Sequence, residues 1–180
     1  MKQILFVIGI SILLFSCNAK NDTDNTGEKS NKNKDTTSYA YKATYSSDVT
    51  IPSKPEFAQI VLTVWKMFES NQIDSMRKYY ADTVTYDMVN GMRFYGSSKD
   101  LLEFARKDIA ELDSLRFDIL MWQSVHINDK NEDWVYIWAR ERRYDKHGKA
   151  DTSLIHEQWK IENNKVTYFN QFEAKPAKKQ

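Results

Sequence analysis

Apolar side chains recur every three or four residues in the middle of the chain, which is the signature of helices with one buried face. The first such stripe comprises Phe57, Ile60, Val61, Val64, Trp65 and Phe68. A short second helix is predicted over Ile73–Tyr80, with Met76, Tyr79 and Tyr80 on its buried side. A third is predicted to end at Glu111 and to begin at Ser97 or Ser98, either of which can cap it. Three helices are therefore expected.

Strand-like alternation separates the second and third helices and then takes over after the third. Val84–Met88 and Arg93–Tyr95 are expected to form a hairpin around Gly91. Beyond the third helix the apolar period changes from 3.6 to 2, and the predicted strands are Leu115–Ile127, Asp133–Tyr144, Thr152–Glu162 and Lys165–Glu173. Their short polar connections are typical of antiparallel turns. The fold class is therefore α+β, with three N-terminal helices packed on a curved antiparallel sheet.

The N-terminus carries a different pattern, an apolar run over Ile4–Phe15 behind Lys2. It is too short for a spanning helix, which needs roughly 20 residues, and fits a secretory signal. Leu14-Phe15-Ser16-Cys17 resembles the bacterial lipobox, in which an apolar residue stands three positions before an acylated cysteine. The resemblance implies a signal peptide over 1–16 and lipidation, including palmitate, at Cys17. An ordinary secretory signal and an uncleaved anchor are the alternatives.

Residues 17–54 are expected to be the acylated cysteine followed by a disordered tether, because the segment from Asn18 to Ser38 has no apolar side chain larger than alanine. Asn18 is not the aspartate that, in the bacterial sorting rule, retains lipoproteins in the inner membrane. This resemblance favours the outer membrane of the cell envelope, on its periplasmic or outer side. The membrane, reached through the lipid, is thus one expected partner.

Composition indicates one globular domain over 55–174, followed by a short basic tail over 175–180. The 26 basic and 25 acidic residues are interspersed, so no electrostatic footprint for nucleic acid is present. Because Cys17 is the only cysteine, no internal disulfide is possible and stability must come from a packed core.

The order of elements resembles the nuclear transport factor 2-like, or SnoaL-like, superfamily, also called the cystatin-like cone, over about residues 56–174. Local motifs support it: Tyr79-Tyr80-Ala81-Asp82, Phe94-Tyr95-Gly96 and the hairpin from His156 to Val166. Asn164 replaces the usual glycine of the last turn and tolerates positive φ. The resemblance implies helices and a concave sheet face that enclose a cone-shaped pocket. Relatives use that pocket for isomerase, dehydratase or cyclase chemistry, or for binding, so the fold does not settle the function.

Strand parity predicts which residues line the pocket. Ile155, Glu157, Trp159 and Ile161 share one face, and Val166, Tyr168, Asn170 and Phe172 are the matching set on the last strand, although a bulge would invert such an assignment. The pocket-lining candidates are Tyr80, Tyr86, Trp138, Glu157, Trp159, Tyr168 and Asn170.

Glu157 is the candidate for proton-transfer chemistry, since burial would raise its pKa and a tyrosine could assist as a donor. The favoured alternative is a carboxylate that pairs with Arg140 or Arg142 across the sheet, or that lies at an exposed strand end. Asp82 is expected to act locally at a turn, and Asp87 to face solvent if Tyr86 packs inside. No catalytic residue of the superfamily has a secure match.

Metal and cofactor sites are not expected, because His126, His147 and His156 are scattered and no phosphate-binding loop or nucleophile motif is present.

Trp134, Tyr136 and Trp138 alternate with Val135, Ile137 and Ala139, so both faces of their strand are apolar enough to be covered. One face must meet the helices, and the superfamily resemblance implies that the other, convex face meets a second subunit in a homodimer. A large aromatic core in a monomer is the alternative.

The favoured function is a lipid-tethered module that binds a small, largely apolar ligand, with no assigned catalysis. The alternatives are a pocket enzyme with a buried carboxylate and a protein-interaction module.

Overall fold

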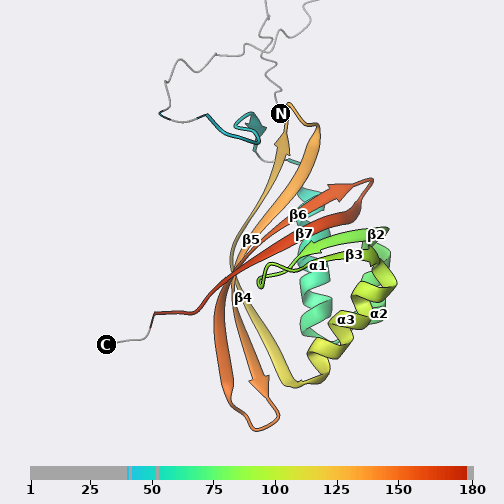
Figure 1. Ribbon diagram of the computed structural model, residues 1–180, viewed down its shortest axis with the longest axis vertical. Coiled ribbons are helices and arrows are strands. Elements are labelled where there is room, and N and C mark those ends of the chain that lie inside the picture. The colour runs from blue at the N-terminus through green and yellow to red at the C-terminus, as the bar shows by residue number, and fades with distance from the viewer. Residues whose placement is uncertain (1–39, 41, 52, 178–180) are drawn as a thin grey trace, which may run out of the picture. The chain divides into compact units, whose positions relative to one another are not determined.

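The computed structural model describes residues 40, 42–51 and 53–177. Its elements are β1 (Val49–Thr50), α1 (Pro55–Glu69), α2 (Ile73–Met76), the 3-10 turn η1 (Arg77–Tyr79), β2 (Tyr80–Asp87), β3 (Arg93–Ser97), α3 (Ser98–Ala110), β4 (Leu112–Ile127), β5 (Glu132–Asp145), β6 (Ala150–Glu162) and β7 (Lys165–Ala174). One seven-stranded sheet has the order β1-β4-β5-β6-β7-β2-β3. The helices lie on one side of β4–β7 (Figure 1).

The helices form where the apolar stripes predict them. Pro55 starts α1, where its missing N–H costs nothing. Ser97 caps α3, because its Oγ accepts a hydrogen bond from the Asp100 backbone N–H at 3.1 Å. The predicted second helix is too long at its end, since α2 tightens into η1 and Tyr80 already begins β2.

The long strands β4 to β7 pair antiparallel in sequence order, which confirms the prediction from their turns. The prediction of a purely antiparallel sheet is wrong, however, because β2 pairs parallel with β7. The sheet is mixed and open. Local patterning could not reveal this pairing, since β2 and β7 are separated in sequence by β3, α3 and three long strands.

Residues 45–51 and Ser53 lie against the domain, although the sequence pattern assigned them to the tether. Val49 pairs with Ile127, and the Ser53 backbone N–H donates to the Ser124 carbonyl at 3.1 Å. Tyr45 Oη also donates to Glu132 on β5. Polar backbone and side-chain contacts therefore hold residues whose composition suggested no order.

A bulge in β7 decides which side chains face the helices. Lys160 pairs with Tyr168 and Ile161 pairs with Val166, so Thr167 is an extra residue between them. Val166, Phe169 and Gln171 consequently point inward. Tyr168, Asn170 and Phe172, which alternate with Phe169 and Gln171, point outward. The inward prediction for Tyr168, Asn170 and Phe172 is wrong for this reason.

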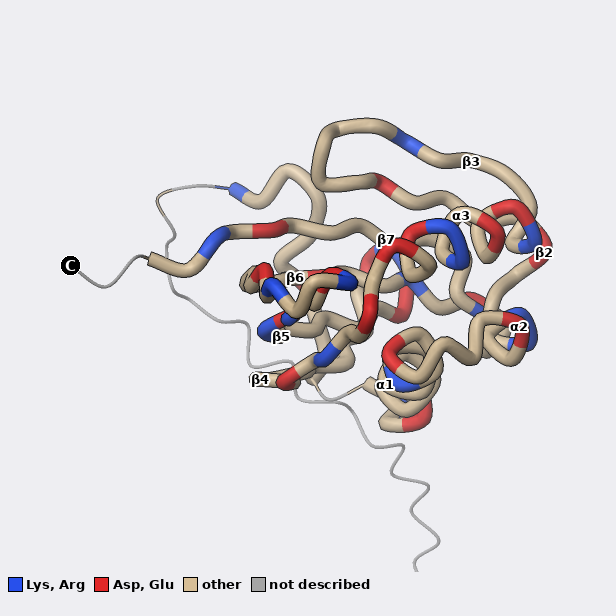
Figure 2. Tube along the Cα trace, turned by 90° about the horizontal axis from the view of Figure 1, so that it is seen from below, with Lys and Arg blue, Asp and Glu red and all other residues tan. Residues whose placement is uncertain are grey.

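The core fills the space between the helices and the inner face of the sheet, defined as the face that carries Val135, Ile137 and Ala139. Ile155, Trp159 and Ile161 are buried there beside Glu157, as parity predicted for β6. Acidic and basic residues are interspersed over the elements (Figure 2). In the part of the chain that the structure describes, no helix is long and apolar enough to cross a membrane.

Candidate functional site

A cavity of about 130 Å³ lies between the helices and the inner face of the sheet. Its apolar wall comes from α1, α2, α3 and β4 and includes Val64, Phe68, Met76, Leu101, Leu102 and Phe117. The aromatic residues Trp65, Tyr80, Tyr86, Trp159 and Phe169 also line it. Only a few polar side chains enter this apolar space, so their partners define the chemistry that it can perform.

Glu157 on β6 is one of two buried glutamates in the cavity wall, with 8% of its surface exposed against 7% for Glu141. Its Oε2 accepts a hydrogen bond from Trp65 Nε1 at 2.9 Å and another from Trp159 Nε1 at 2.8 Å. Burial raises the pKa of the Glu157 carboxyl to about 8, and the two indole donors oppose that rise. Both hydrogen bonds go to Oε2, and among the described residues no side chain donates to Oε1.

Aromatic stacking fixes the two indole donors. Trp159 stacks on Phe169 with ring centroids 4.5 Å apart and planes 9° apart, and Phe169 stacks in turn on Tyr86 at 4.3 Å. Trp65 packs on Phe117 at 4.5 Å. Because each ring has neighbours on its face, the Glu157 carboxyl meets donors that are already in position.

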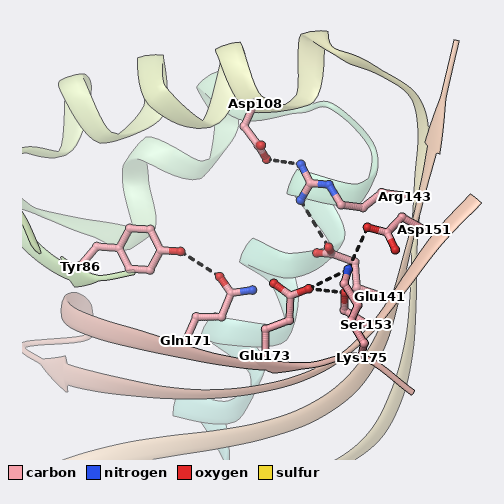
Figure 3. Close-up of polar contacts among 9 residues, drawn as sticks. All are labelled: Tyr86, Asp108, Glu141, Arg143, Asp151, Ser153, Gln171, Glu173 and Lys175. Atoms are coloured by element: carbon pink, nitrogen blue, oxygen red, sulfur yellow. Dashed lines mark hydrogen bonds and ion pairs between the residues drawn. The ribbon is translucent and has the colours of Figure 1, made fainter. Parts of the chain in front are cut away.

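A second polar group lies at another part of the cavity wall. Arg143 on β5 donates to Asp108 on α3 at 2.6 Å and to Glu141 on β5 at 3.3 Å, as Figure 3 shows. Burial raises the pKa of Glu141, and the neighbouring guanidinium opposes the rise. Tyr86 Oη donates to Gln171 Oε1 at 2.8 Å. The cavity thus holds one carboxyl without a cation, Glu157, and two that bind Arg143.

A chain of polar contacts on β6 and β7 continues beyond Glu141. Ser153 donates to Glu173, and Lys175 Nζ lies 3.0 Å from Glu173 and 2.8 Å from Asp151 (Figure 3). These residues are absent from the cavity lining. Lys175 compensates the charges of Asp151 and Glu173 where the inner face of the sheet reaches solvent.

Four of the seven candidate residues meet at the cavity: Tyr80, Tyr86, Glu157 and Trp159. The other three, Trp138, Tyr168 and Asn170, lie on the outer face of the sheet, so their assignment to the pocket is corrected. The β7 bulge turns Tyr168 and Asn170 outward. Trp138 alternates with the buried Ile137 and stacks on the outward-facing His156.

Asp82 and Asp87, the other two carboxylates considered from the sequence, do not line the cavity that contains Glu157. Asp87 binds Arg93 at 2.5 Å and accepts from Tyr168 Oη at 2.8 Å, outside the cavity. Asp82 is exposed and lies 3.2 Å from Arg77.

Arg140 and Arg142, the expected partners of Glu157, instead pair with Asp118 on the outer face. The interpretation of Glu157 as an arginine-paired carboxylate is therefore wrong.

Sequence reasoning missed five members of the site that carry hydrogen-bonding side-chain atoms: Trp65, Asp108, Glu141, Arg143 and Gln171. Alternation along β5 carried a usable signal, since Glu141 and Arg143 continue the inward series of Val135, Ile137 and Ala139. Gln171 could not be placed without the β7 bulge. Asp108 lies on α3 seven residues after Leu101 and four after Phe104, so the apolar stripe of that helix already placed it on the buried side.

In the described ranges, no three His, Cys, Asp or Glu side chains lie close enough to hold a metal ion together. His126 Nδ1 lies 3.0 Å from Asp133, whereas His156 lies on the outer face. Cys17 falls outside the described residues.

Comparison with solved structures identifies the fold of this domain. An LEH-like epoxide hydrolase of M. tuberculosis matches with a TM-score of 0.58 and 10% identity, over 68% of this chain and 86% of that one. An NTF2-like protein of unknown function from Burkholderia pseudomallei has a TM-score of 0.54 and 14% identity, over 66% and 90%. The domain has an NTF2-like fold.

A further NTF2-like structure, described as a SnoaL-like polyketide cyclase from Shewanella putrefaciens, matches with a TM-score of 0.51 and 11% identity, over 67% of this chain and 81% of that one. No protein-family model matches the sequence, and no curated protein is significantly similar to it. At these identities the similarity establishes the fold and leaves the chemistry to the residues of the cavity.

Proposed function

We propose that the NTF2-like domain binds a small, largely apolar molecule that carries one hydrogen-bond-accepting oxygen, such as a cyclic ketone. The observation that carries this proposal is Glu157, a buried carboxyl in the cavity that binds two indole N–H groups and no cation. At neutral pH such a carboxyl is mostly protonated, because its pKa is raised to about 8.

The position of the proton follows from the hydrogen bonds. Oε2 accepts from both Trp65 and Trp159, so the neutral acid carries its proton on Oε1. Oε1–H is then a hydrogen-bond donor surrounded by apolar walls. A ligand that lacks an acceptor oxygen would leave that donor without a partner, which costs about 1–3 kcal/mol.

The size of the cavity limits the ligand. An engineered apolar protein cavity of about 150 Å³ holds benzene, and the space here is about 130 Å³. The space therefore corresponds in volume to about one six-membered ring.

Cyclohexanone and methylcyclohexane serve as matched probes, since they have similar bulk and differ in the acceptor oxygen. We expect cyclohexanone to raise the melting temperature at pH 6.5 and to lose most of that effect at pH 9.5, where Glu157 is ionised. Glu157→Gln places an amide NH₂ at the position of Oε1–H and should bind the ketone equally at both pH values. Equal stabilisation by both probes at both pH values would show that Glu157 does not select the ligand.

Acid–base catalysis is the second candidate, and the pair of differently placed carboxyls in one cavity favours it. Glu157 is positioned as an uncharged acid, whereas Glu141 and Asp108 bind Arg143. Two of the similar structures are described as an LEH-like epoxide hydrolase and a SnoaL-like polyketide cyclase, which supports a catalytic role as the second candidate.

Deuterium exchange at the carbon atoms next to the carbonyl of cyclohexanone, followed by NMR in D₂O, tests for proton transfer directly. A catalytic site should accelerate the exchange in the wild-type protein and not in Glu157→Gln. Binding without any acceleration would leave the domain as a binding module.

We further propose that Cys17 carries the lipid that attaches the domain to the outer membrane, as the similarity of Leu14–Cys17 to the lipobox supports. Metabolic labelling with palmitate should mark the wild-type chain and not Cys17→Ser. Equal labelling of both chains, or of neither, would contradict acylation at this residue.

A further inference from the structure

Three consecutive large apolar side chains are exposed on β4, near the edge of the sheet. Leu120, Met121 and Trp122 are 57%, 52% and 51% exposed. The strand contains no charged residue from Ile119 to Val125. Native proteins commonly protect exposed strand edges with charged side chains. An uncharged stretch with three exposed apolar side chains therefore indicates a contact surface.

A bulge spreads these side chains around the edge. The register of β4 against β5 shifts between Ile119 and Met121, so Leu120 is an extra residue. Met121 then lies on the outer face, opposite Trp138, whereas Trp122 lies on the inner face. The apolar side chains thus surround the edge of the sheet and do not line one face of it.

The backbone of this stretch has no neighbouring strand on its free side. The N-terminal segment follows the β4 edge only as far as Ser124, whose carbonyl accepts a hydrogen bond from the Ser53 backbone N–H at 3.1 Å. Among the described residues, no strand pairs with the edge beyond that point. The extra residue Leu120 interrupts the ladder that an added strand would need. This edge therefore suits a partner that contacts side chains better than it suits a peptide strand.

The same edge receives the segment that leads back to Cys17. β1 pairs there with Ile127, which lies five residues, or about 17 Å, from Trp122 along the strand. Ala40, where the described residues begin, follows Cys17 by 23 positions, and a chain of that length spans at most about 80 Å. A lipid on Cys17 would keep the β4 edge within this distance of the membrane, so that even a weak contact becomes effective.

Exposed cations lie at both ends of the apolar stretch. Lys54 follows the segment that runs along the β4 edge, and Arg116 lies three residues before the stretch; their side chains are 61% and 63% exposed. The carboxylates that they contact, Asp133 and Glu69, are largely buried. Asp118, beside the stretch, pairs with arginines on β5. Exposed cations next to an apolar edge are complementary to the anionic head groups of a membrane.

We infer that the β4 edge around Leu120, Met121 and Trp122 inserts its apolar side chains into the surface of the membrane that holds the lipid. Tryptophan favours the interface between membrane and water, because its ring is apolar and its N–H can donate to head groups. The inference rests on the proposed attachment through Cys17 and adds a second contact, made by the folded domain itself.

Quenching of tryptophan fluorescence by brominated lipid tests this contact on the full-length chain. Because Cys17 is the only cysteine, unacylated chain from cell-free synthesis can be coupled through it to a maleimide lipid. The vesicles consist of phosphatidylcholine and phosphatidylglycerol with bromine on their acyl chains. Trp122 is the most exposed of the five tryptophans. We therefore expect quenching in the wild-type protein and the loss of most of it in Trp122→Phe.

Trp138→Phe is the matched control and should keep the quenching, because Trp138 lies on the outer face away from the edge. Leu120→Asp places a charge in the edge and should abolish it. Melting curves identify any misfolded variant, and Trp122→Phe alone is sufficient if Leu120→Asp unfolds. No quenching in the wild-type protein, or a loss in Trp138→Phe and not in Trp122→Phe, would overturn the inference. Failure of palmitate labelling with quenching intact would instead contradict only the natural lipid on Cys17.

Discussion

Glu157 and His156 are neighbours in sequence, and they show how differently the two faces of the sheet are covered. Burial raises the pKa of Glu157 and lowers the pKa of His156, so both side chains favour their uncharged forms. Glu157 points inward and has two indole donors. The outward-facing His156 is stacked between Trp138 and Phe172, and its buried Nε2 has no partner. On the inner face the buried Oε2 of Glu157 has hydrogen-bond partners, whereas on the outer face the buried Nε2 of His156 has none among the described residues.

This difference assigns the cavity to the inner face. Helices cover the inner face, and the polar groups that remain there surround a cavity of defined size. Other side chains of the sheet cover the outer face only in part. Substitutions on the inner face should therefore affect stability and ligand binding more strongly than those on the outer face.

The largest expected effect is the loss of an inner-face tryptophan. Trp159→Ala removes a fully packed ring that stacks on Phe169 and donates to Glu157, so it should lower the free energy of unfolding by about 3–5 kcal/mol. Trp138→Ala, on the outer face, should cost only about 1–2 kcal/mol in the monomer. Urea unfolding at low protein concentration measures both values. Equal costs would contradict the difference between the faces.

The next effect is a pH dependence that arises from Glu157. Its pKa in the folded domain is about 8, above the ordinary value of 4.5. Between these values the folded protein retains a proton that the unfolded chain releases, so stability falls as pH rises through this window. The slope should be about 1.4 kcal/mol per pH unit. Unfolding measured from pH 5 to pH 9 should show this decline in the wild-type protein.

Glu157→Gln provides the comparison for that slope. The amide oxygen can accept from both indoles, and the NH₂ group replaces Oε1–H, so this variant should keep its stability up to pH 9. Asp87→Asn is the control on the other face, where a hydrogen bond from Arg93 lowers the pKa of Asp87. It should leave the wild-type decline unchanged. A decline that persists in Glu157→Gln would assign the titration to another group.

The smallest effect is expected at His156, where stability should fall as pH drops and not as pH rises. Its pKa is lowered from the ordinary value of 6.5, so the unfolded chain takes up a proton first and stability falls as pH drops below about 6.5. His156→Phe removes the unpaired Nε2 and should stabilise the monomer by about 1 kcal/mol at neutral pH. It should also reduce the loss of stability on acidification. His147→Phe, in an exposed turn, should change neither property.

Much of the fold could be predicted because its determinants are local. The apolar stripe of α1, the Ser97 cap and the short turns between β4 and β7 each depend on residues close together in sequence. Asn163 and Asn164 both adopt positive φ in the last turn, as the sequence suggested. The parallel pairing of β2 with β7 is not local, and no pattern in either strand encodes the identity of its neighbour.

The site was predicted less completely for the same reason. Parity placed Glu157 and Trp159 correctly because β6 pairs with β5 without a register shift. One extra residue, Thr167, inverted the assignment of Tyr168 and Asn170. The partners of Glu157 come from Trp65 on α1 and from its own strand, and only the packing of that helix onto the sheet brings Trp65 within 2.9 Å.

The sequence by itself determined the kind of domain, the order of its elements and the identity of the residue that now marks the cavity. It also predicted, through Cys17, where the protein works. Tertiary structure decided that Glu157 binds two tryptophans and no arginine, and that Trp138 faces outward. The physical reason is that hydrophobic periodicity fixes which side of an element is buried, whereas a buried charge depends on groups from distant segments that only packing brings together.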